Sequence, residues 1–180
     1  MSGSSFYDPG AFRHVAINLF YGWGYNFYRR ENQLRADDQL IRAKAAWLLG
    51  LAHACLDELE QTWRREKLPA PSRAHPYPDP AAVEGARTLE RLAKAVGGLV
   101  GRLHAQPAPE NDRMTERYRR EAETLIALAA CDEQLVGQSE MLRSALDGKE
   151  PDWALDNAAF LGEGVAAIEE TLRQRQMILS

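Results

Sequence analysis

Apolar residues recur every three or four positions along this chain, and that spacing is the feature that most constrains its fold. Positions three and four apart lie on one side of an α-helix, whereas a half-buried β-strand alternates apolar and polar residues. The clearest run follows spacings of 4-3-4-3-4-4 and holds Ile41, Ala45, Leu48, Ala52, Cys55, Leu59 and Trp63. No alternating stretch competes with the pattern. The sequence therefore predicts an all-α helical bundle.

Helix caps and chain breakers divide the sequence into about five predicted helices. Their approximate ranges are 10–31, 36–67, 80–105, 112–146 and 152–178, with a proline-rich loop at 68–80. We expect Asp79 and Asp152 to cap the third and fifth helices, and Gly148 to close the fourth in a left-handed conformation. Because 180 residues are enough for one hydrophobic core, the prediction is a single-domain antiparallel bundle.

Composition and charge exclude several classes of protein. Hydrophobic residues make up 45% of the chain and charged residues 27%, as in ordinary soluble domains. No apolar run reaches the roughly 18 residues that a membrane-spanning helix needs, and the first residues lack the pattern of a secretory signal. The net charge is −4 and basic residues form no long run. We therefore expect a cytoplasmic protein with neither a membrane nor a nucleic acid as partner.

Aromatic residues are concentrated at the N-terminal end, where nine of the 15 lie within the first 28 residues. On a helical wheel this predicted helix has two apolar sides. One side, the Phe/Trp arc, holds Phe12, Ala16, Leu19, Phe20, Trp23 and Phe27. The other side, the Tyr arc, holds His14, Ile17, Tyr21, Tyr25 and Tyr28.

Two interpretations of these arcs remain open. In one, the helix lies in the middle of the bundle and both arcs are core. In the other, which the chemistry favours, the Phe/Trp arc packs on its own bundle and the Tyr arc binds a protein partner or a second copy. Tyrosine suits an interface that is part apolar and part wet. Arg29, Arg30 and Arg35 would form a charged rim, and the protein would be a non-catalytic accessory, adaptor or assembly subunit.

Two glycines in the same segment, Gly22 and Gly24, are costly inside a helix unless a neighbour comes close or the helix bends. The third predicted helix offers small residues at matching spacing, namely Ala93, Gly97 and Gly101. We therefore expect the rings of Trp23 and Phe27 to pack against this strip. The alternative is a simple break in the third helix at Gly97.

The motifs of common catalytic and metal sites are absent from the sequence. No histidine follows a glutamate by three positions, as ferritin-like carboxylate sites require. Neither a phosphate-binding loop nor a G-x-S-x-G or H-E-x-x-H motif occurs. The two cysteines lie 76 positions apart in apolar surroundings and are expected to be buried thiols. We assign no catalytic residue, metal ligand or cofactor, and an enzyme is the less favoured class.

A weaker constellation of polar residues keeps a second hypothesis open. Helical spacing turns Asp132 toward the core, and a buried carboxylate needs a partner. His53 is one candidate partner, and Arg42, Lys44 or another arginine are others. Cys55 lies two residues after His53. The alternative function is a small-molecule, metal or cofactor-binding bundle, with a pocket near Tyr21, Tyr25, His53, Cys55 and Asp132.

Overall fold

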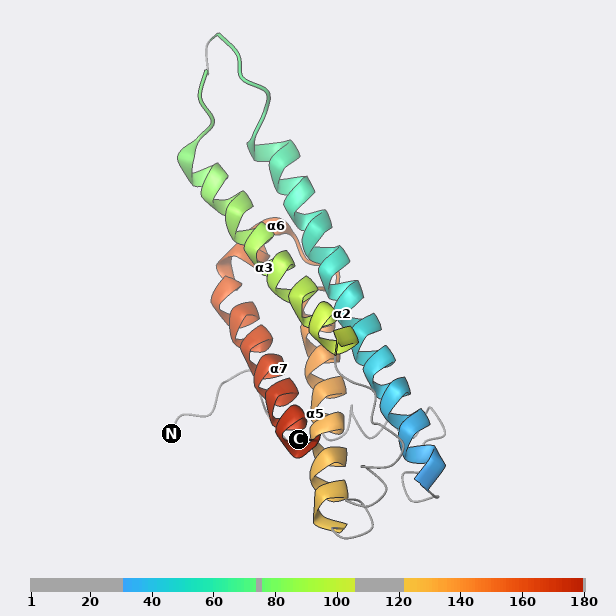
Figure 1. The fold of residues 1–180 in the computed structure, drawn as a ribbon. Coiled ribbons are helices and arrows are strands. Elements are labelled where there is room, and N and C mark those ends of the chain that lie inside the picture. The colour runs from blue at the N-terminus through green and yellow to red at the C-terminus, as the bar shows by residue number, and fades with distance from the viewer. Residues whose placement is uncertain (1–30, 74–75, 106–121, 180) are drawn as a thin grey trace.

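The computed structural model describes residues 31–73, 76–105 and 122–179 (Figure 1). Within these ranges the chain forms helices and no strand, which confirms the predicted all-α bundle. The helices are α2 (Glu31–Lys67), α3 (Pro80–Ala105), α5 (Ala122–Leu146), α6 (Pro151–Asp156) and α7 (Ala158–Leu179). None of the helices in the described ranges has the length and apolar content needed to cross a membrane.

The four long helices form two antiparallel hairpins that lie side by side. α2 packs against α3 and α5 packs against α7, while α2 also contacts α5 and α3 also contacts α7 (Figure 1). α2 and α5, which belong to different hairpins, run parallel. Arg42 near the start of α2 interacts with Asp132 of α5, and Cys55, further along α2, feels the charge of Asp147 just after the end of α5. The short α6 packs across α2 and α3. Antiparallel packing therefore holds within each hairpin but not between them.

Leucine, alanine and valine side chains from all four long helices fill a main core, and Ile41, Leu48 and Val136 form a second, smaller cluster. α3 begins and ends at the residues expected from the sequence. Most residues of the expected stripes are buried. Leu49, Leu56, Leu92 and Leu99 are buried as well, so the apolar sides of α2 and α3 are wider than expected. Core residues with no more than 1% exposure are Ala45, Leu48, Leu49, Ala52, Leu56, Leu89, Val96, Leu99, Leu103, Leu135, Leu142, Ala154, Leu161 and Ile168. These wide apolar stripes account for the four-helix arrangement.

Two of the three expected helix ends have the predicted chemistry. The backbone N–H of Ala81 donates to Asp79 Oδ1 at 3.2 Å, so Asp79 caps α3, and Pro80 occupies its first position. Gly148 has φ = 65°, the left-handed conformation that glycine adopts without a steric penalty. Asp152 does not cap its helix: the N-cap of α6 is Glu150, followed by Pro151, and Asp152 lies in the first turn.

The predicted fifth helix is divided in two at Asn157. The side-chain amide and the backbone N–H of Asn157 both donate to the carbonyl of Trp153, at 2.8 and 3.0 Å. This double contact holds Asn157 at φ = −106° and ψ = 17°, outside the helical region. Asparagine competes in this way with the regular helical ladder. A further difference is that α2 already begins at Glu31, rather than at about residue 36.

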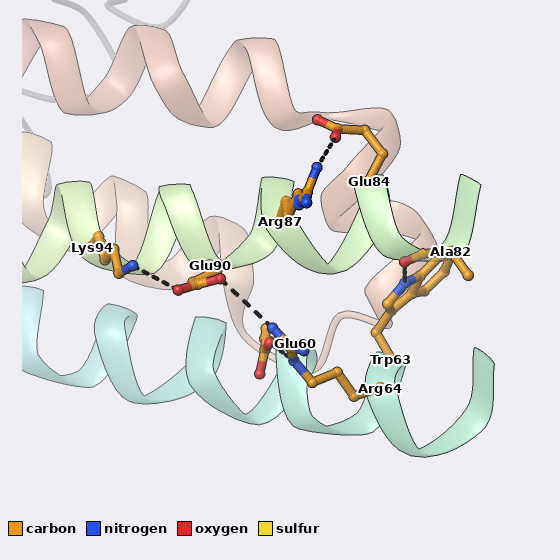
Figure 2. A network of polar contacts seen from close by, with 8 residues as sticks. All are labelled: Glu60, Trp63, Arg64, Ala82, Glu84, Arg87, Glu90 and Lys94. Atoms are coloured by element: carbon orange, nitrogen blue, oxygen red, sulfur yellow. Dashed lines mark hydrogen bonds and ion pairs between the residues drawn. The ribbon is translucent and has the colours of Figure 1, made fainter. Parts of the chain in front are cut away.

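The indole of Trp63 joins the end of α2 to the start of α3 (Figure 2). Its Nε1–H donates to the carbonyl of Ala82 at 2.8 Å. The ring lies so close to Gly85 that a Cβ on that residue would be 2.7 Å from Trp63 Cζ2. Glycine at this position therefore permits the contact between the two helices.

A row of charged groups lies beside this contact on the surface (Figure 2). Arg64 pairs with Glu60 of its own helix and approaches Glu90 of α3 at 3.6 Å. Lys94 Nζ lies 2.6 Å from the other oxygen of Glu90. Exposed pairs of this kind contribute little individually, so Trp63 is the stronger link within the hairpin.

Part of the small-residue strip on α3 is covered by α2. The ring of His53 lies over Gly97, where a Cβ would be 2.9 Å from His53 Cδ2. Ala93 is in the core, while Gly101 is exposed and has open space around it. The close approach at Gly97 is therefore made by α2. Trp23 and Phe27 lie outside the described residues.

The glycines of α3 provide a matched pair of stability tests. Gly98→Ala is expected to raise the free energy of unfolding by up to about 1 kcal/mol, because alanine is the better helix former and the site is open. Gly85→Ala gains the same propensity but drives a methyl group into the Trp63 ring, so it is expected to lower stability. Urea denaturation measures both changes. Equal stabilisation by the two variants would contradict the Trp63 contact.

Candidate interaction surface

A row of apolar residues on α2 faces solvent instead of the core. We call this row the outer face of α2. The exposed fractions are 47% for Leu40, 54% for Trp47 and 38% for Leu51. Smaller exposed residues lie between and beyond these side chains, namely Ala43, Gly50 and Ala54. Together these six residues make a continuous strip along the middle of the helix.

The outer face lies opposite the core side of the same helix. At 100° per residue, its centre is about 150° around the helix from Leu49 and about 170° from the mean direction of the buried positions of α2. The strip runs from Leu40 to Ala54, about 21 Å at 1.5 Å per residue. Beyond Ala54 the same side of the helix carries exposed polar residues, namely Glu58, Gln61 and Arg65. Between Leu40 and Ala54, α2 thus has two apolar sides, and beyond Ala54 it has one.

Charged groups border the outer face where α2 meets α5. The Nζ of Lys44 lies 3.9 Å from the centroid of the Trp47 ring, a cation–π contact that holds the indole against the helix. Burial lowers the pKa of Lys44, and the negative charge of Glu140 opposes that decrease. On α5, Arg143 pairs with Glu140 at 2.7 Å and with Asp147 at 3.5 Å. An apolar strip with a charged border resembles the anatomy of a protein interface.

The residues of the predicted Tyr arc adjoin this surface in sequence. His14, Ile17, Tyr21, Tyr25 and Tyr28 lie outside the described residues, as do Arg29 and Arg30. Arg35 belongs to α2, but its side chain is not among those described. Leu40, the first residue of the outer face, comes nine positions after Glu31, where α2 begins.

Buried polar groups form a separate cluster between α5 and α7. Arg175 Nε donates to Asp132 Oδ1 at 2.6 Å, and the two residues are 1% and 2% exposed. Further along the same helix pair, the hydroxyl of Thr171 donates to Gln138 Oε1 at 2.9 Å. Ser139 donates to the Leu135 carbonyl of its own helix. The inward orientation predicted for Asp132 is correct, and an arginine is its partner.

The carboxylate of this cluster is neutralised by arginines of the protein itself. Burial raises the pKa of Asp132 and lowers the pKa of Arg175, because the charged form of each group is poorly solvated. The positive charge of Arg42 opposes the rise for Asp132. A carboxylate between two guanidinium groups serves as a structural ion pair and is poorly placed for proton transfer to a substrate.

Of the candidate pocket residues, His53 and Asp132 are not brought together, and Tyr21 and Tyr25 lie outside the described residues. His53 faces α3 and its Nδ1 lies 3.0 Å from Asp57 Oδ2. Asp132 interacts with Arg42, which is 11 residues, or about 16 Å, from His53 along α2. Cys55 is half-buried at the edge of the core. Among the described residues, no group of three or more His, Cys, Asp or Glu side chains is arranged to hold a metal ion.

The sequence analysis did not predict the outer face, although the sequence contains a signal for it. Leu40, Trp47 and Leu51 are spaced by seven and four residues, the spacing of a second helical stripe. The stripe through Ala45 and Ala52 is the stronger one in this helix and masks the second. Comparisons of the chain with protein-family models, curated proteins and solved structures gave no match.

The ion pair of Asp132 and Arg175 can be tested with a double-mutant cycle. Asp132→Leu or Arg175→Met alone is expected to cost about 3–5 kcal/mol, because the remaining buried charge loses its closest opposite charge. The double variant is expected to cost less than either single change. Urea denaturation of the three variants gives the coupling. Additive losses would show that the two groups are independent.

The thiols provide a second test. Burial raises the pKa of Cys131 and of Cys55, and the carboxylates of Asp132 and Asp147 add to the respective increases. A raised pKa leaves less of the reactive thiolate at pH 7. We expect both thiols to react slowly with a disulfide reagent, and the 8%-exposed Cys131 more slowly than Cys55. The reaction rate of the single remaining thiol is measured in Cys55→Ser and in Cys131→Ser, each in the native protein and in urea. A native Cys131 as fast as in urea would contradict this expectation.

Proposed function

We propose that this protein is a non-catalytic helical accessory, adaptor or assembly subunit that binds a protein partner through its aromatic N-terminal segment. The observation that carries the proposal is the outer face of α2. Among the described residues, the large exposed apolar side chains of the helices gather there, apart from Met177 on α7. An exposed apolar patch commonly marks a contact surface, and this one lies on the helix that the aromatic segment joins.

The chemistry of the described bundle supports a binding role over a catalytic one. Its most deeply buried carboxylate is held by Arg175, and its two thiols have raised pKa values. Catalysis by an acid, base or nucleophile needs such groups to be poised beside a substrate. The alternative pocket of His53 and Asp132 receives no support, because Asp132 of α5 interacts with Arg42, about 16 Å along α2 from His53.

The partner surface that fits this end of the molecule is a protein with an apolar patch bordered by carboxylates. Tyrosines of the Tyr arc, including Tyr21 and Tyr25, would anchor it, since tyrosine and tryptophan supply much of the energy of protein interfaces. Arg29, Arg30 and Arg35 would meet the carboxylates. A second copy of the chain is one such partner, because residues 110–180 carry 15 acidic and 8 basic side chains.

The test is the loss of binding when tyrosine rings are removed from the Tyr arc. Tyr21→Ala/Tyr25→Ala is expected to weaken binding about 30-fold or more, as loss of a 2 kcal/mol anchor would. Tyr77→Ala is the matched control, because Tyr77 lies in the loop after α2 and is 86% exposed. Binding is measured by titration with the purified partner, and self-association by light scattering. Wild-type affinity in the double variant with unchanged circular dichroism would reject the proposal.

A further inference from the structure

The outer face of α2 needs an occupant, because Leu40, Trp47 and Leu51 lie in line on a helix whose opposite side is already buried. Residues 1–30 join α2 directly at Glu31 and contain a predicted helix with two apolar arcs. A tethered segment has a high effective concentration at such a surface, so it competes well against partners in solution.

We propose that the Phe/Trp arc packs on the outer face of α2 as an antiparallel helix, and that this packing turns the Tyr arc toward solvent. The inference rests on the proposed function, since it explains how one arc is left for a partner. It also replaces the strip on α3 as the site for the Phe/Trp arc, because His53 already covers Gly97 there.

The two surfaces have the same length and the same repeat. From Phe12 to Phe27 a helix measures about 22 Å, against about 21 Å for the outer face. Both follow alternating steps of three and four residues, which is what two helices need to meet along a common seam. The outer face becomes polar after Ala54, so its apolar surface ends there.

The tether fixes the register of the pairing. Four peptide units between Phe27 and Glu31 reach at most about 14 Å, and neighbouring helix axes are about 8–10 Å apart. Phe27 must therefore lie near the beginning of α2. Residues 12–23 are then level with Leu51 to Leu40, with the numbers of facing residues summing to about 63.

At two levels between the pairs Phe12–Leu51 and Trp23–Leu40, this register brings a large residue opposite a small one. Ala16 faces Trp47, which is the largest side chain of the strip. Phe20 faces Ala43, whose methyl group is exposed in the described bundle. Alternation of large and small residues across a seam lets side chains interdigitate without voids.

Hydrogen exchange of the full chain tests the docking. Ala43→Glu is expected to be harmless on an exposed helix surface, but a carboxylate beneath Phe20 would expel the segment. We expect amides of residues 12–23 to exchange at least about tenfold more slowly than unstructured amides in the wild type, and to lose this protection in Ala43→Glu. Ala166→Glu, at an exposed alanine of α7, is the matched control and should preserve it.

Three outcomes would overturn the docking. Unprotected amides in the wild type would mean that the segment does not pack. Protection that survives Ala43→Glu would place it elsewhere. Protection that rises with protein concentration, together with a dimer in light scattering, would assign the outer face to a second copy. The proposed function fails by a different result, unchanged binding in Tyr21→Ala/Tyr25→Ala, so the two proposals are tested independently.

Discussion

The ion pair between Asp132 and Arg175 is the constraint on which the arrangement of α5 and α7 depends. Both groups are almost fully buried, so either one alone would be strongly destabilising. Sliding one helix past the other by a turn, about 5.4 Å, would separate the charges while leaving leucine opposite leucine. Apolar packing alone would allow several registers of α7 against α5. The ion pair and the hydrogen bond of Thr171 with Gln138 form in only one of them. These polar contacts make the core specific.

The first hairpin is held by different means. Trp63 reaches across to Ala82, and Gly85 and Gly97 let α2 and α3 come close. Shape thus determines the pairing of α2 with α3, whereas buried charge determines that of α5 with α7. Arg42 links the two hairpins, because it lies on α2 and acts on Asp132. α2 therefore contacts α3 on one flank and α5 on the other, and still has an apolar side that no described helix covers.

Helical periodicity was sufficient to predict the fold class, the bounds of α3 and most of the core. It also turned Asp132 inward, because the spacing from Leu128 to Leu135 passes through that position. It could not identify Arg175 as the partner, since the pairing joins residues 43 positions apart and depends on how two helices face each other. The break at Asn157 was missed for another reason: a single side chain competing for one carbonyl leaves no trace in the apolar pattern.

The separation of Asp132 and Arg175 along the chain imposes an order on synthesis. At about 5–20 residues per second, a ribosome adds the 43 residues between them in roughly 2–9 s. Helical hairpins form within milliseconds, so α2 and α3 can pair before Arg175, the partner of Asp132, has been synthesised. During that interval the nascent α5 keeps Asp132 hydrated and its leucines uncovered. The nascent chain is therefore most accessible to chaperones and proteases just before α7 leaves the ribosome.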